Sequence, residues 1–122
     1  MKPPSPRTVE VGTVASVVAL SGVLWVGLPS VWATTLLSNL AQCLAPALAA
    51  AAAWGAARRR TRANDRRAWR LIAASAASWS AGQIIWTYYE VSGVAAPYPS
   101  LADVGYVLAV PLALAGVWSR CV

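Results

Sequence analysis

Few residues in this chain could take part in chemistry, and acids are the scarcest of them. There are only four Asp and Glu residues in total, and there is no His. Glu90 and Asp103 stand in the second half of the chain, with no Lys or Arg between them. If the fold holds them close together, two such carboxylates could bind a cation or titrate as a sensor. If it does not, they are solvated carboxylates in a loop, and the sequence leaves both interpretations open.

Polar and aromatic residues near these acids extend the candidate site. Gln83 lies in an apolar run, about six residues or roughly 9 Å of helix before its end. It could contact a ligand, or it could form an interhelical hydrogen bond, typically worth less than about 2 kcal/mol in a membrane. Nearby aromatic side chains could line a pocket or anchor the helices at the membrane interface. The candidate sensing or ligand residues are therefore Gln83, Trp86, Glu90, Asp103 and Tyr106.

Asp103 also fits a purely structural role. Ser100 and Asp103 have the S-x-x-[DE] spacing of a capping box at a helix start. The Ser100 hydroxyl would accept a hydrogen bond from the Asp103 amide, and the Asp103 carboxylate would accept one from the Ser100 amide. Pro97 and Pro99 hold the preceding residues extended, so the helix is expected to begin sharply.

The remaining residues exclude several classes of function. Without His, the two cysteines, Cys43 and Cys121, cannot complete a zinc site, and we expect both to be unpaired. No Gly-rich loop joins a strand to a helix, and no catalytic constellation is present. The sequence therefore predicts no enzyme, no metal and no cofactor. The net charge of +6 could suggest nucleic acid, but the basic residues lie between apolar runs, so we expect no nucleic-acid partner.

The composition indicates what positions these residues. The chain is 58% hydrophobic and 11% charged, far from the balance of a soluble domain. We predict an all-α polytopic membrane protein with four transmembrane helices, and the lipid bilayer as its main partner. The expected organisation is a proline-rich tail at 1–10, helices at 11–28, 34–57, 68–89 and 101–118, and an end segment at 119–122.

Several details of these runs have structural consequences. The first run could instead be a cleaved signal peptide, although it is longer than the usual apolar segment of one. Pro46 is expected to kink the second helix unless neighbouring helices satisfy the freed carbonyl. The stretch 63–65, Ala-Asn-Asp, is a plausible turn in the hydrophilic connector. In the third run Ala74, Ser78 and Gly82 recur every four residues and predict a small-residue face for helix packing.

Basic residues predict the orientation. Seven of the ten Lys and Arg fall in one connector, and they could serve topology or dock anionic lipid headgroups. These are Arg58, Arg59, Arg60, Arg62, Arg66, Arg67 and Arg70. With four helices, Lys2, Arg7 and Arg120 fall on the same side as this cluster. The positive-inside rule then places both termini in the cytoplasm, in a multi-pass protein of the inner (plasma) membrane.

The second half of the chain resembles the N-terminal membrane region of actinobacterial signalling proteins. In that family a cytoplasmic output domain follows, most often a GGDEF diguanylate cyclase, with or without an EAL phosphodiesterase, and sometimes a histidine kinase or a phosphatase. The residues that match the family pattern are Trp69, Trp79, Gly82, Trp86, Tyr89, Glu90, Pro97, Pro99, Ser100, Ala102, Asp103, Tyr106 and Pro111. The family has an intramembrane Asp where this chain has Gln83, and a Tyr where it has Val110.

The resemblance implies a sensory input module without an output domain, either a truncated or split family member or a stand-alone module. It also implies a homodimer or a separate cytoplasmic output protein as partner. The alternatives are a small transporter subunit, a membrane scaffold, or a degraded gene product. A transporter would be expected to carry an ionisable residue at mid-membrane, and the predicted helices have none.

Overall fold

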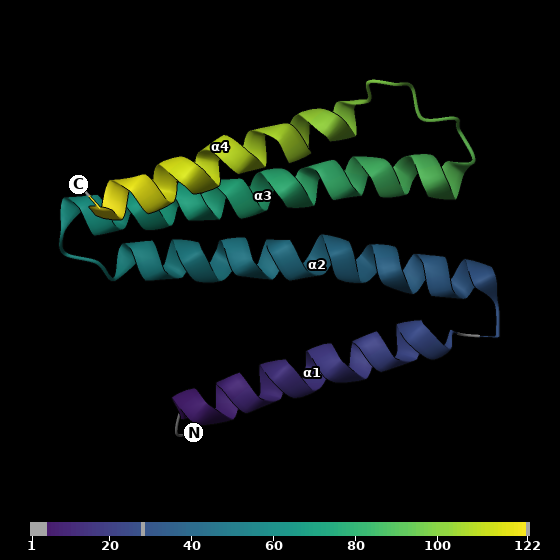
Figure 1. Ribbon diagram of the computed structural model, residues 1–122, viewed down its shortest axis with the longest axis horizontal. Helices are drawn as coiled ribbons and strands as arrows, with labels where there is room; N and C mark the ends of the chain where they lie inside the picture. The colour runs from purple at the N-terminus through teal and green to yellow at the C-terminus, as the bar shows by residue number, and fades with distance from the viewer. Residues whose placement is uncertain (1–4, 28, 122) are drawn as a thin grey trace. The chain divides into compact units, whose positions relative to one another are not determined.

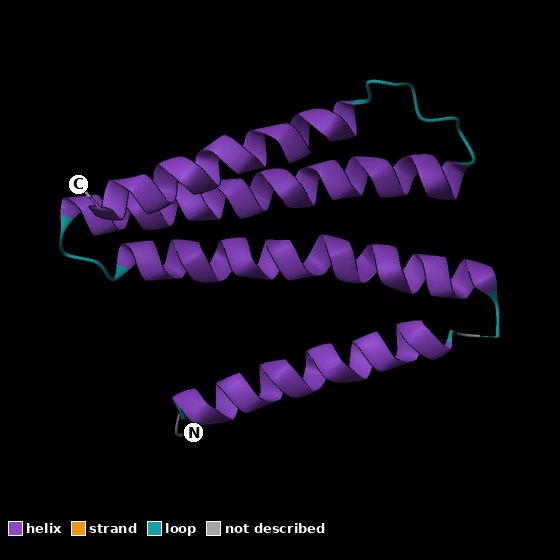
Figure 2. Cartoon of the chain, viewed as in Figure 1, coloured by secondary structure: helices purple, strands orange, loops and turns teal. Residues whose placement is uncertain are grey.

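The computed structural model describes residues 5–27 and 29–121, and these residues form four helices without a strand. The helices are α1 (Pro6–Val26), α2 (Val31–Arg58), α3 (Ala63–Ser92) and α4 (Leu101–Cys121), joined by short loops (Figures 1 and 2). The all-α prediction is therefore confirmed. Lys2, the first part of the predicted tail, Leu28 and Val122 lie outside the described residues.

The prediction that residues 1–10 form a non-helical tail is wrong from Pro6 onward. Ser5 is the N-cap of α1, and its side chain accepts a hydrogen bond from the Thr8 amide at 3.2 Å. Pro6 occupies the first turn, where a helix has no use for the missing N–H and where the fixed φ of proline suits the backbone. Pro6 therefore stands at the start of a helix and does not break one.

The turn predicted at 63–65 is also wrong, because these residues form the first turn of α3. The loop between α2 and α3 lies earlier in the sequence, and it follows Arg59 and Arg60, whose amides still donate to carbonyls of α2. Asp65 then stands in the first turn of α3, where the helix dipole favours a negative charge. The helices α2 and α4 continue without interruption through Pro46 and Pro111.

The chain divides into two compact units, Met1–Ser38 and Asn39–Val122. In the first unit α1 satisfies its own polar side chains: the hydroxyls of Thr13 and Ser16 donate to the carbonyls of Val9 and Gly12, each at 2.8 Å. Such back-bonding removes free donors from the helix surface, as a lipid environment requires.

In the second unit α3 and α4 lie side by side along their length (Figure 1). Their contact is made of small residues, and among the described residues the buried apolar side chains are all alanines. A Cβ added to Gly105 would lie 2.7 Å from the Ser78 carbonyl oxygen, and one added to Gly116 would lie 3.0 Å from the Ile72 side chain. Close approach of two backbones through small residues is the usual packing of membrane helices.

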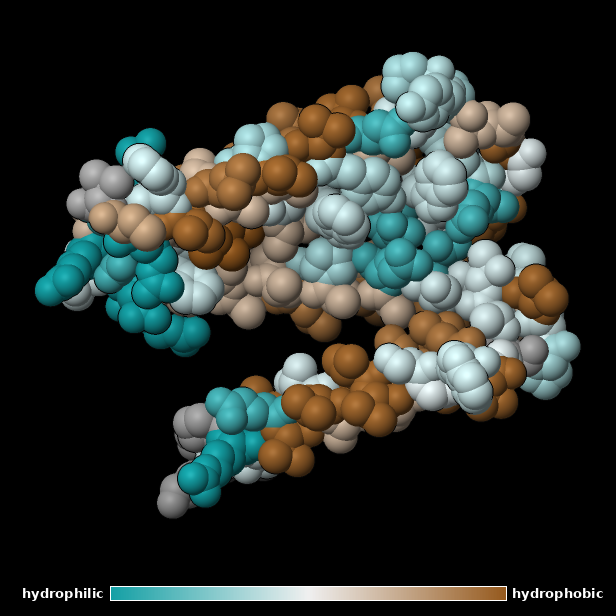
Figure 3. All heavy atoms as spheres, viewed as in Figure 1, coloured by the Kyte–Doolittle hydropathy of each residue, from teal (hydrophilic) through white to brown (hydrophobic). Residues whose placement is uncertain are grey.

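Large apolar side chains point outward instead. Trp25, Val107 and Trp118 are among many that are more than half exposed, and Figure 3 shows hydrophobic residues over α4. Small residues inside with large apolar residues outside is the arrangement expected where lipid replaces water. Three helices are long and apolar enough to cross a membrane, namely α1 over Arg7–Val26, α2 and α4. The chain is therefore suited to a membrane, and α3, although 30 residues long, is not among these three spans.

Candidate functional site

Four polar side chains form one continuous chain of hydrogen bonds across three helices. Tyr106 on α4 donates from its hydroxyl to Gln83 Oε1 at 2.8 Å. Gln83 on α3 donates from Nε2 to Asn39 Oδ1 at 3.4 Å. Asn39 on α2 donates from Nδ2 to the Glu90 carboxylate on α3 at 2.5 Å. We call Glu90, Asn39, Gln83 and Tyr106 the hydrogen-bonded tetrad.

The hydrogen bonds of the tetrad all run in one direction, from Tyr106 to Glu90. Each member donates to the next and the chain ends on a carboxylate, so each bond strengthens its neighbour. Asn39 and Gln83 are both 4% exposed, whereas Glu90 is exposed. The charge at the accessible end is thereby connected through two buried amides to Tyr106, whose ring packs on Trp79 with a centroid distance of 5.0 Å.

Further hydrogen bonds attach the polar face of α3 to both neighbours. Toward α2, Ser80 donates to the Cys43 carbonyl at 2.8 Å, and the Cys43 thiol lies 3.6 Å from the Thr87 hydroxyl. Toward α4, Ser75 and Ser78 donate to the backbone carbonyls of Ala109 and Gly105 at 2.7 and 2.8 Å. These three serine hydroxyls of α3 therefore bond to protein and do not need water.

The structure brings together three of the five predicted sensing residues, Gln83, Glu90 and Tyr106, through the tetrad. Trp86 lies on an exposed surface of α3, and Asp103 belongs to the start of α4. Glu90 and Asp103 accept hydrogen bonds from different partners, and no group of three or more potential metal ligands gathers among the described residues.

Sequence reasoning missed Asn39 as a site residue. The sequence did contain an indication of its role, because an amide side chain within an apolar run needs a hydrogen-bond partner. Its partners could not be identified because Gln83 is 44 residues away and Glu90 is 51 residues away.

At the start of α4 the acidic half of the predicted capping box is present. Asp103 Oδ2 accepts from the Ser100 amide at 2.7 Å. The Ser100 hydroxyl does not take the predicted role, because it donates to the same carboxylate oxygen at 3.2 Å while the Asp103 amide donates to the Ser100 carbonyl. The preceding Tyr98–Pro99 peptide bond is cis.

An open and largely apolar groove of about 630 Å³ adjoins this cap. Tyr89 of α3 lines it from one side, and Leu101, Val104 and Leu108 of α4 line it from the other. The Asp103 carboxylate lies at its edge but is already bound by Ser100. The groove therefore offers apolar contact and little polar recognition.

The predicted packing face of α3 is only partly in place. Gly82 contacts α4 so closely that an added Cβ would lie 2.8 Å from the Ala102 carbonyl oxygen, and Ser78 bonds to Gly105. Ala74 is exposed, and Ser75 makes the contact with α4 in its place. Spacing of three and four residues alternates along a packed helix, so a strict four-residue repeat drifts off the contact.

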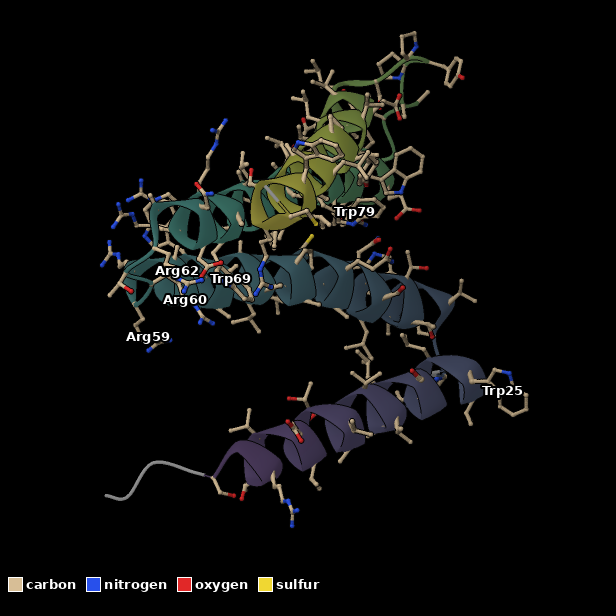
Figure 4. The ribbon with its side chains drawn as sticks, turned by 60° about the vertical axis from the view of Figure 1, so that its left-hand side comes forward. Trp25, Arg59, Arg60, Arg62, Trp69 and Trp79 are labelled. Carbon is tan, nitrogen blue, oxygen red and sulfur yellow. The ribbon has the colours of Figure 1, made fainter. Side chains whose placement is uncertain are left out.

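The arginine-rich connector lies at the opposite end of α3 from the tetrad's carboxylate. Figure 4 shows Arg59, Arg60 and Arg62 around the loop between α2 and α3, with Trp69 beside them. Arg59, Arg62, Arg66 and Arg67 are exposed, and Figure 3 shows hydrophilic residues gathered at this end. The Trp69 indole N–H is buried without a hydrogen-bond partner among the described residues, so no hydrogen bond from this ring orients it.

Comparison of the chain with protein-family models, with curated proteins and with solved structures gave no match.

Proposed function

We propose that this chain is the membrane-embedded input module of a bacterial signal-transduction protein, non-catalytic by itself, with four spanning helices. The observation that carries the proposal is the hydrogen-bonded tetrad, because it links an exposed carboxylate to three helices through two buried amides. A stimulus that changes the surroundings of Glu90 would alter the bonds that hold α2, α3 and α4 together. The resemblance to the membrane regions of diguanylate cyclases supports the same conclusion.

A spanning role for α3 is supported by where its polar side chains bond. Ser75, Ser78 and Ser80 donate to backbone carbonyls of neighbouring helices, and Gln83 is buried in the tetrad. A helix whose polar groups are satisfied by protein can lie in a bilayer despite modest hydropathy.

Four spanning helices would place both termini and the arginine connector on the cytoplasmic side. The tetrad's carboxylate and the loop at 93–99 would then face outward. Signal would pass from this side through α4 to a partner at the C-terminal end, either a second copy or a separate output protein.

Topology is tested by thiol labelling of intact cells with a membrane-impermeant maleimide. In a Cys121→Ser background, Ala95→Cys should be labelled from outside, and in the natural background Cys121 should be labelled only after permeabilisation. If α3 does not span, both results reverse, because one crossing fewer moves the 93–99 loop inside and the C-terminus outside. Reversal would overturn the four-helix arrangement.

The sensory role is tested by joining a diguanylate cyclase domain after the C-terminal residue and measuring cyclic di-GMP in cells. Glu90→Gln removes the charge of the tetrad but keeps an acceptor for Asn39, and it should change the output. Glu10→Gln removes a charge from α1, outside the tetrad, and serves as the matched control. Equal outputs from the natural chain and Glu90→Gln would rule out sensing through the tetrad.

A further inference from the structure

Trp54, near the end of α2, holds two arginines from different helices. The guanidinium carbon of Arg58, the last residue of α2, lies 5.9 Å from the centre of the Trp54 ring. That of Arg70, on α3, lies 5.7 Å from the same centre. Both distances are within the range of a cation–π interaction. The ring therefore gathers two positive charges that are twelve residues apart in the chain.

Trp69 holds a second pair, but that pair is partly neutralised. Arg60 and Arg120 lie 5.8 and 5.9 Å from the Trp69 ring centre. Arg120 also faces Asp65, with 3.9 Å between Nε and Oδ1, and this is the one ion pair within residues 5–27 and 29–121. The two arginines on Trp54 therefore have no carboxylate partner in the described part of the chain.

The surroundings of Trp54 indicate the chemistry of a missing partner. Trp54 is 46% exposed, and Leu48, on the same helix, is 69% exposed. The ring thus lies between an apolar helix surface and a group of positive charges, which is the position of an interfacial tryptophan. A guanidinium presents several N–H donors in a plane and pairs well with phosphate oxygens.

We propose that Trp54, Arg58 and Arg70 form a binding site for the phosphate of an anionic phospholipid headgroup. The two guanidinium groups bind the phosphate oxygens, while the outward apolar surface of α2 contacts the acyl chain. A lipid fits better than a soluble phosphate because a lipid can contact both the two guanidinium groups and the apolar surface of α2. The site needs only that the arginine-bearing end of α2 lies at a membrane surface, and it does not depend on signalling or on whether α3 spans.

The test uses the full chain purified in a neutral detergent, with bound lipid counted by native mass spectrometry during titration with phosphatidylglycerol or phosphatidylcholine. The natural chain should bind phosphatidylglycerol in preference to phosphatidylcholine. The double variant Arg58→Gln/Arg70→Gln should weaken that binding by about tenfold or more, because each Lys or Arg near an anionic membrane surface adds to the affinity for the headgroups. Arg66→Gln/Arg67→Gln removes the same charge from the same connector, away from Trp54, and should weaken it far less.

Circular dichroism must show equal helix content for both double variants, so that unfolding is separated from loss of the site. Equal weakening by the two variants would reduce the effect to net charge and overturn the site, as would equal binding of the two lipids. Displacement of phosphatidylglycerol by an equal concentration of inorganic phosphate would show that the acyl chain adds nothing, and it would overturn the assignment to lipid. Arg58→Lys/Arg70→Lys, which keeps the charge, should restore only part of the binding because an ammonium lacks the planar donor set.

Discussion

Gly82 of α3 and Gly105 of α4 approach each other so closely that a Cβ added to Gly105 would lie 2.8 Å from the Cα of Gly82. Real Cβ atoms do not reach this distance, so the contact needs glycine on both helices. This pair sets the separation of α3 and α4 directly beside Gln83 and Tyr106, the next residues on the two helices. It thereby also sets the reach of the Tyr106 hydroxyl toward Gln83.

Gly105→Ala should therefore destabilise the packing of α3 on α4 by about 1–3 kcal/mol, as overpacking of a tight contact does. The measurement is denaturant-induced unfolding in detergent, followed by circular dichroism. Gly12→Ala is the control, because nothing lies within 4 Å of a Cβ added there and alanine favours a helix over glycine. If Gly105→Ala were as harmless as Gly12→Ala, the close contact of α3 and α4 would be wrong.

The tetrad predicts that Asn39 and Tyr106 are energetically coupled, although they do not bond to each other. Both bond to Gln83, so Asn39→Ala and Tyr106→Phe should each cost less than about 2 kcal/mol. Together they should depart from additivity by about 0.5 kcal/mol or more, because they share one partner. The same unfolding assay, run as a double-mutant cycle, measures this coupling.

For comparison, Tyr106→Phe combined with Ser92→Ala should be additive, since the Ser92 hydroxyl bonds only to its own helix, at the carbonyls of Tyr88 and Tyr89. Additive behaviour in both cycles would mean that the tetrad does not act as a unit.

The two residues of the α4 cap should differ in importance. Asp103→Ala removes the acceptor of the Ser100 amide and a favourable charge at the helix N-terminus, so it should cost about 1 kcal/mol. Ser100→Ala should cost less, because the Ser100 hydroxyl donates to Asp103 and does not cap an amide of the helix. Amide hydrogen exchange over the first turn of α4 would separate the two. A larger effect for Ser100→Ala would instead favour the capping box in its usual form.

The two thiols should differ in reactivity toward a maleimide in detergent. Cys121 is exposed, whereas Cys43 is half-buried beside the Thr87 hydroxyl, so Cys121 should be modified first. Mass spectrometry of the peptides during labelling measures the order. Thr87→Val should speed modification of Cys43 if this contact protects the thiol, and no change in rate would contradict that role.

The sequence by itself determined the helical class and the number of helices. Its apolar runs are long and separated by proline, glycine and arginine, and a helix satisfies the backbone hydrogen bonds within a single such run, as lipid requires. It also indicated Gln83, Glu90 and Tyr106, because polar groups among apolar residues need partners. The sequence did not predict where two helices begin, α1 at Pro6 and α3 at residues 63–65. Proline, Asn and Asp are common both at the start of a helix and in the turns that interrupt one.

Tertiary structure alone decided which polar groups meet. Asn39 and Gln83 come together because α2 and α3 pack with a particular rotation about their axes, and a rotation of one residue would separate them. The same rotation places Ser75 against α4 and leaves Ala74 outside. The sequence does not predict this rotation, because the helices are weakly amphipathic and rich in alanine and have no dominant apolar stripe that would define it. Contacts between particular small and polar residues define it instead, and these exist only in the folded chain.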